Sequence, residues 1–94
     1  MMPLMVFKVR DRSMEPGLRE GDFIVVYTWG RKFRRGDIVV FPHPGTGMRM
    51  VKRVTRSGRD SCFVVGDNSR LSEDSRKFGD IRAGSIVGKV ILHV

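Results

Sequence analysis

The chain has 94 residues, of which 40% are hydrophobic, and 18 basic against 10 acidic residues give it a net charge of +8. This length suits one domain with a modest core, and the composition favours a packed fold over disorder. No run approaches the roughly 20 apolar residues of a membrane helix, and the short apolar start, residues 1–7, does not resemble a secretory signal. We therefore expect a single soluble domain over residues 1–94, with the cytoplasm as the default location.

Short β-branched and aromatic runs, separated by Gly, Pro, Asp and Asn, predict strands along the whole chain. In chain order, the expected strands cover residues 4–9, 23–27, 37–41, 48–56, 62–65 and 86–94. Residues 13–18 and 72–76 are each expected to form a single helical turn, because their Pro, Gly, Ser and Asp residues disfavour longer helices. This spacing predicts an all-β domain built as a small coiled antiparallel sheet or half-open barrel.

The densest basic cluster covers residues 31–35 and has Phe33 inside it and Trp29 nearby. Its ordinary interpretation is a solvated loop between two strands. The net charge also permits contact with an anionic partner, such as a nucleic acid, an acidic peptide or a membrane surface.

Cysteine and histidine give no sign of a metal or disulfide. Cys62 is the single cysteine and lies in an apolar run, so we expect a buried core residue. His43 and His93 are far apart and neither has a metal-ligand spacing. We therefore expect no catalytic zinc and no cofactor.

Two residues are candidates for chemistry. Lys52 shares one face of an alternating strand with Met50 and Val54, and partial desolvation there would lower its pKa and yield an amine that can deprotonate a serine. Ser13 follows a strand on a turn constrained by Pro16 and can present a hydroxyl and a backbone N–H together. Taken alone, each has an ordinary alternative: a lysine that extends to solvent, and a serine that caps a turn.

A third segment, residues 66–79, is dense in short hydrogen-bonding side chains and is bracketed by two glycines. Its length and composition predict a structured loop rather than a flexible one. Within it, Asp74 and Arg76 can form a local ion pair.

Together, these segments resemble the motifs of the signal peptidase I family of Ser/Lys proteases. The four matching segments, in the family's order, are Ser13–Leu18 (nucleophile motif), residues 35–41 (Arg-Gly-Asp strand motif), residues 51–54 (lysine motif) and residues 66–76 (last motif). Four weak motifs in the right order make a specific signal.

The resemblance implies that Ser13 attacks the scissile carbonyl while Lys52 acts first as base and then as acid. The backbone N–H of Ser13 would form part of the oxyanion hole, on a substrate-facing turn that includes Met14 and Pro16. The substrate would bind as an extended strand against exposed strand edges.

In the last motif, Ser72 corresponds to the serine that orients the lysine, and Asp74 with Arg76 corresponds to a structural ion pair. Two positions depart from the family pattern. Asp11 stands where a serine or glycine is common, and an ionised carboxylate cannot donate to an oxyanion. Gly17 replaces the usual threonine, which should loosen the turn without affecting the dyad.

A compact subgroup, the nickel-type superoxide dismutase maturation proteases, is similar in residues 62–68 and 74–79. The similarity implies a soluble enzyme without membrane anchor or second β-domain, which removes a short N-terminal leader from a precursor protein. The nickel then belongs to the substrate.

Three alternatives stay open. The first is general signal peptidase I-type processing of exported preproteins. The second is self-cleavage, as in repressor and mutagenesis proteins, although only twelve residues precede Ser13. The third, from another class, is a non-enzymatic basic β-barrel that binds nucleic acid. A catalytically dead module is disfavoured by the intact Ser13 and Lys52.

Overall fold

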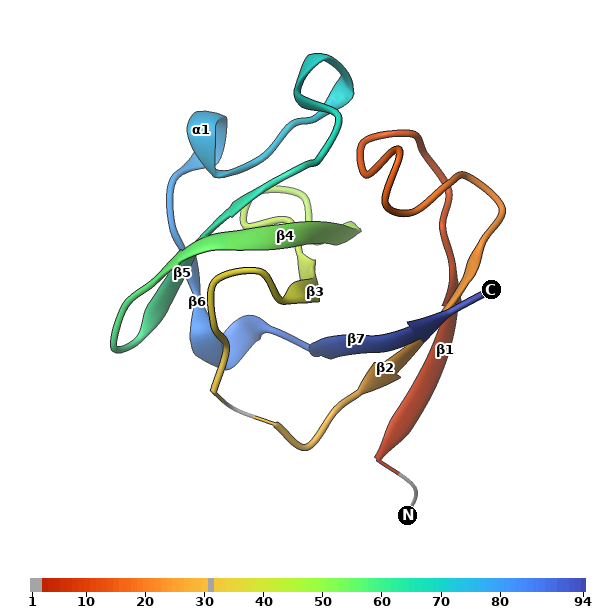
Figure 1. Ribbon diagram of the computed structural model, residues 1–94. Helices are drawn as coiled ribbons and strands as arrows, with labels where there is room; N and C mark the ends of the chain where they lie inside the picture. The colour runs from red at the N-terminus through yellow and green to blue at the C-terminus, as the bar shows by residue number, and fades with distance from the viewer. Residues whose placement is uncertain (1–2, 31) are drawn as a thin grey trace.

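The computed structural model describes residues 3–30 and 32–94, which form one antiparallel sheet of seven strands (Figure 1). The strands are β1 (Leu4–Lys8), β2 (Phe23–Tyr27), β3 (Ile38–Pro42), β4 (Arg49–Ser57), β5 (Ser61–Val65), β6 (Ile81–Arg82) and β7 (Gly88–His93). Their spatial order is β1-β2-β7-β3-β4-β5-β6, so the last strand of the chain lies between β2 and β3. The helical segments are α1 (Ser75–Phe78) and the 3-10 turns η1 (Ser69–Leu71) and η2 (Ala83–Ser85).

The predicted fold class, a mainly β domain with a coiled half-open sheet, is confirmed. Each expected strand forms with its ends within two residues of the prediction, whereas the two-residue β6 is too short to show a pattern. Residues 13–17 form a hydrogen-bonded turn rather than a helix, and the predicted turn near residues 72–76 is α1, which Asp74 caps by accepting from the backbone N–H of Arg76.

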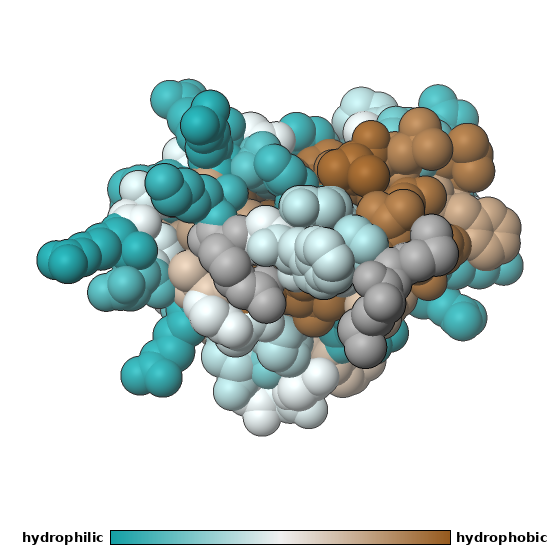
Figure 2. Space-filling model, turned by 90° about the horizontal axis from the view of Figure 1, so that it is seen from below, coloured by the Kyte–Doolittle hydropathy of each residue, from teal (hydrophilic) through white to brown (hydrophobic). Residues whose placement is uncertain are grey.

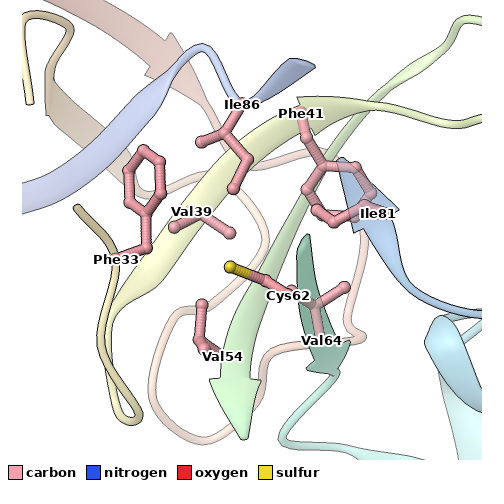
Figure 3. Close-up of a cluster of buried hydrophobic side chains, with 8 residues drawn as sticks. All are labelled: Phe33, Val39, Phe41, Val54, Cys62, Val64, Ile81 and Ile86. Carbon is pink, nitrogen blue, oxygen red and sulfur yellow. The ribbon is translucent and has the colours of Figure 1, made fainter. Parts of the chain in front are cut away.

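Two groups of buried side chains pack on opposite faces of the curled sheet. The first core cluster comprises Phe33, Val39, Phe41, Val54, Cys62, Val64, Ile81 and Ile86 (Figure 3). The second core cluster comprises Val9, Met14, Leu18, Ile24, Val26 and Val40. Because neighbouring residues of a strand point to opposite faces, Val39 and Val40 contribute to different clusters, and β3 is covered on both sides.

The basic cluster of residues 31–35 is only partly solvated. Phe33 is 6% exposed within the first core cluster, while Lys32, Arg34 and Arg35 are exposed. Trp29 is 60% exposed, and Arg31 lies outside the described residues, as do residues 1–2 of the apolar start. Since Phe33 is buried, it cannot serve as a stacking platform for bases beside Trp29.

One side of the molecule carries exposed hydrophobic residues. Figure 2 shows hydrophobic side chains gathered on one side of the face seen from below. The exposed large hydrophobic residues of β1, β2 and β7 are Leu4, Met5, Val6, Phe23, Ile91 and Leu92.

Candidate active site

The turn that carries Ser13 is fixed by its own apolar residues. Met14 and Leu18 are buried in the second core cluster, and the backbone N–H of Leu18 donates to the carbonyl of Met14 at 3.0 Å. The peptide bond between Glu15 and Pro16 is cis. With both ends of the turn anchored in the core, Ser13 is held in place and is itself only 3% exposed.

Lys52 reaches Ser13 from β4, where it lies on the strand face that also supplies the first core cluster. The predicted alternation of β4 is confirmed, because Met50 and Val54 pack in or against the first core cluster on the same face as Lys52. Lys52 is 2% exposed, and its Nζ donates to the Oγ of Ser13 at 2.7 Å. The structure thus brings together two side chains that lie 39 positions apart in the sequence.

The surroundings of Lys52 alter its acidity. Burial is the largest effect and lowers the pKa of Lys52 from the ordinary value of 10.5. Three carboxylates oppose this shift: Asp11, Asp74 and Glu73, in decreasing order. Arg76 adds a smaller effect in the same direction as burial. The result is a lysine that releases its proton more readily than a solvated one, as a general base requires.

The loop after β5 is organised around Asp74. Its carboxylate is buried and accepts hydrogen bonds from the Ser72 hydroxyl at 2.7 Å, the Gly66 backbone N–H at 2.9 Å and the Arg76 guanidinium at 2.7 and 2.9 Å. The predicted pairing of Asp74 with Arg76 is therefore present. Ser72 is directed at Asp74, and no hydrogen bond joins it to Lys52 within the described residues. Any effect of Ser72 on Lys52 must therefore pass through Asp74 or through packing.

This loop also holds the turn that carries Ser13 in place. The backbone N–H of Asn68 donates to the Ser13 carbonyl at 2.8 Å, and the Asn68 side-chain amide donates to the Arg12 carbonyl at 3.2 Å. A Cβ atom on Gly66 would lie 2.7 Å from the Ser13 carbonyl oxygen and 2.6 Å from the Cβ of Ser72, so only glycine fits here. Figure 1 shows the turn after β1 and the loop after β5 side by side at the top of the view.

A cleft of about 350 Å³ opens beside Lys52 and Asp11, and the buried Ser13 is not among its lining residues. It is lined by residues 6–11, Met14 and residues 49–52. Pro16, predicted to belong to the substrate-facing turn, is exposed and is not among these lining residues. Within residues 3–30 and 32–94, β1 pairs only with β2 and residues 49–52 of β4 pair only with β3, so two strand edges border the cleft.

Two curated proteins match this sequence. "Signal peptidase complex catalytic subunit SEC11" of Clavispora lusitaniae is 34% identical over 65 residues, which is 65% of this chain and 39% of that protein. "Mitochondrial inner membrane protease subunit 2" of Schizosaccharomyces pombe is 29% identical over 96 residues, which is 82% of this chain and 53% of that protein. The chain therefore spans about two fifths to one half of the length of these relatives.

The profile of the family described as "Peptidase S24-like" matches residues 2–91. The chain belongs to this family. The resemblance to signal peptidase I-like proteases that the four motifs predict is confirmed by these matches. The names of the two relatives describe those proteins and assign no substrate to this chain.

The four motif segments meet in space around Arg53, whose partners the sequence does not reveal. Its guanidinium donates to both carboxylate oxygens of Asp67, at 2.8 and 2.9 Å, and to the Gly36 carbonyl at 2.9 Å. A Cβ on Gly17 would lie 2.7 Å from the Asp67 carboxylate. A side chain at position 17 would therefore meet the Arg53–Asp67 ion pair, for which glycine leaves room.

Asp11, the other departure from the expected motif, contacts Ser13 directly. Its Oδ1 accepts hydrogen bonds from the Ser13 hydroxyl at 2.8 Å and from the Ser13 backbone N–H at 3.0 Å. The N–H predicted as an oxyanion donor is thus engaged with this chain's own carboxylate. A sequence comparison marks the unusual residue type at position 11, but the two hydrogen bonds appear only in three dimensions.

Two other side chains that could be reactive, Cys62 and His43, are engaged in core packing and in hydrogen bonds to the backbone. The prediction for Cys62 is confirmed: the residue is 2% exposed in the first core cluster, and burial raises the pKa of its thiol. His43 Nδ1 accepts backbone N–H groups from Gly45 and Thr46, and its ring packs on Phe78. Across residues 3–30 and 32–94, no group of three His, Cys, Asp or Glu side chains could hold a metal, and no helix is long and apolar enough to cross a membrane.

Proposed function

We propose that this chain is a serine endopeptidase that cuts an N-terminal leader from a precursor protein, with Ser13 as nucleophile and Lys52 as general base. The observation that carries this proposal is the 2.7 Å contact between Lys52 Nζ and Ser13 Oγ, made by two buried side chains of which Lys52 lines the cleft. A lysine that merely stabilised the fold would extend to solvent rather than end on a serine hydroxyl.

The chemistry proceeds through an acyl-enzyme. Neutral Lys52 takes the hydroxyl proton as Ser13 Oγ bonds to the scissile carbonyl carbon, and the carbonyl electrons move to oxygen. As the tetrahedral intermediate collapses, the C–N bond breaks and the Lys52 ammonium gives its proton to the leaving amine. Lys52 then deprotonates water, which attacks the ester, and Ser13 recovers its proton. Burial assists because it lowers the pKa of Lys52 and keeps bulk water from the amine.

An extended peptide fits the cleft. The unpaired edges of β1 and of residues 49–52 in β4 offer backbone N–H and C=O groups on both sides of a strand that enters between them. The lining alternates apolar side chains, such as Val9 and Met50, with basic ones, such as Lys8 and Arg49. Backbone pairing gives affinity for an extended segment, and the basic side chains favour acidic groups on the substrate.

As the substrate, we propose the precursor of a nickel-type superoxide dismutase. The similarity of residues 62–68 and 74–79 to maturation proteases of that class supports this choice. These stretches hold structural parts of the site. Cys62 lies in the core, Asp67 pairs with Arg53, and Asp74 accepts a hydrogen bond from the Gly66 backbone N–H within the loop. The competing substrate is a secretory preprotein, cut as in general signal peptidase I-type processing.

The experiment compares the two substrates directly. The wild-type chain is incubated with a nickel superoxide dismutase precursor and with a secretory preprotein, and products are followed by intact mass. Cleavage of the first precursor at its leader junction supports the maturation assignment. Faster cleavage of the secretory preprotein, in terms of kcat/KM, replaces that assignment with general processing.

A further inference from the structure

The carboxylate of Asp11 is a third member of the hydrogen-bond chain at the site. Its Oδ1 accepts from the Ser13 hydroxyl at 2.8 Å, while the same hydroxyl oxygen accepts from Lys52 Nζ at 2.7 Å. A serine hydroxyl has one proton to donate. In this arrangement that proton is directed at Asp11, and Lys52 is the donor rather than the acceptor.

This arrangement is the reverse of what nucleophilic attack requires. For general-base catalysis, the Ser13 hydroxyl must donate to the lone pair of a neutral Lys52. The backbone N–H of Ser13 is also occupied, because it donates to the same Asp11 oxygen at 3.0 Å. Neither the proton nor the oxyanion donor is free while Asp11 stays in place.

The negative charge of Asp11 also favours this arrangement, because it keeps Lys52 protonated. Asp11 and Lys52 contact the same hydroxyl oxygen, so the carboxylate stabilises the lysine ammonium. The other charged groups that act on Lys52 are Asp74 and Glu73, which also favour the ammonium, and Arg76, which disfavours it. Among the carboxylates, Asp11 raises the pKa of Lys52 most.

We propose that Asp11 is a positioning residue that holds Ser13 and Lys52 in a resting arrangement, which the substrate releases when its scissile carbonyl displaces the carboxylate from the Ser13 N–H. This inference rests on the proposed dyad. Displacement frees the hydroxyl to turn its proton toward Lys52 and moves the negative charge away from the ammonium. The site is therefore least reactive when the cleft is empty.

The test measures the titration of Lys52 without any substrate. Protein labelled with 13C at lysine Cε is titrated by NMR, with the Lys52 signal assigned by its absence in Lys52→Arg. Asp11→Asn removes the charge and keeps the shape, and we expect it to lower the titration midpoint of Lys52 because the carboxylate no longer stabilises the ammonium. Asp11→Ser removes the same charge with a different side chain, so the comparison survives if one variant folds poorly.

The matched control is Asp22→Asn. Asp22 also accepts a backbone N–H in a turn, from Arg19 at 2.9 Å, but it is not among the groups that act on Lys52. This variant should leave the Lys52 midpoint where the wild type has it. Unchanged midpoints in both Asp11 variants would overturn the proposal and leave Asp11 as a turn-forming residue only.

Kinetics provide the second readout. Below the wild-type midpoint, Asp11→Asn should cut the precursor with a higher kcat/KM than the wild type, because a lower midpoint leaves more neutral amine at the same pH. A uniform loss of kcat/KM at every pH, with no shift of the profile, would contradict the resting-state role. The NMR midpoint is independent of turnover, so a shifted midpoint in a chain that cuts no precursor would count against the proposed function and not against the Asp11–Lys52 coupling.

Discussion

Asp74 receives two hydrogen bonds from the guanidinium of Arg76, at 2.7 and 2.9 Å, and the Asp74 side chain is 1% exposed. Burial alone would raise the pKa of Asp74, but the hydrogen bonds from Arg76, Ser72 and the Gly66 backbone outweigh it and hold the pKa well below the ordinary value of 3.8. The charged carboxylate thus ties together the two ends of the last motif, the loop that supports Ser13.

Asp74→Asn should destabilise the fold at neutral pH by about 2 kcal/mol, because a buried charged acceptor is lost and donors around it lose their partner. Since the pKa of Asp74 is depressed on folding, its contribution is full above the unfolded pKa and is lost as pH falls through the folded pKa. The difference between variant and wild type should therefore shrink in acid. Chemical denaturation at neutral and acidic pH measures this change. Asp80→Asn is the control, because its pair with Arg56 is 3.8 Å long and exposed; an equal loss in both variants would contradict the prediction.

Gly66→Ala should act mainly on kcat and have a smaller effect on the free energy of unfolding. The new Cβ would lie 2.7 Å from the Ser13 carbonyl oxygen, which is backbone and cannot rotate away, so the nucleophile turn must shift. We expect a loss of kcat of about 100-fold, the effect of a displacement near 1 Å at the reacting atoms. Gly84→Ala, where a Cβ would meet nothing within 4 Å, is the matched control. Retention of full activity in Gly66→Ala would show that the turn tolerates such a shift.

The strands follow from short-range patterns, and so do the candidate residues of the dyad. β-branched runs place β2 and β3, and the alternation of Met50, Lys52 and Val54 predicts a lysine on a buried face. In contrast, the burial of Phe33 among basic neighbours runs against its local composition. It depends on the first core cluster, which assembles from distant strands.

The contacts around the dyad are also set by tertiary structure. Arg53 and Asp67 lie 14 positions apart in two different motifs, and the sequence does not show that they pair. Their pairing occupies the space beside Gly17, a glycine that the sequence alone presents only as a departure from the motif. Residue spacing can place Ser13 and Lys52 on their elements, but it cannot tell that Asp11 shares the same hydroxyl.

The pH dependence of activity should follow the ionisation of Lys52. Only the neutral amine can accept the Ser13 proton, so kcat/KM should rise with pH through the pKa of Lys52. Because burial lowers that pKa, the midpoint should lie below the ordinary value of 10.5. A kcat/KM profile for precursor cleavage measures it. A midpoint at or above 10.5 would mean that Lys52 is solvated, contrary to the structure.

Lys52→Met should stabilise the fold while abolishing cleavage. The folded pKa of Lys52 is lowered, so burying its ammonium costs stability below that pKa, and this cost falls as pH rises toward the unfolded value of 10.5. A methionine of similar length removes the cost. Thermal unfolding at neutral pH should give a higher Tm for Lys52→Met than for the wild type, with a smaller gap at higher pH. A lower Tm for the variant at neutral pH would contradict this prediction.

The central claim is that Ser13 is the nucleophile and that Lys52 activates it. Its most direct test is the rate of precursor cleavage, followed by intact mass, for the wild type, Ser13→Ala, Lys52→Ala and the control Lys77→Ala, which alters a side chain that is 77% exposed. Both dyad variants should lose at least about 1,000-fold in kcat, as expected when a nucleophile or its base is removed, while Lys77→Ala should match the wild type. Cleavage by either dyad variant at the wild-type rate would contradict the account.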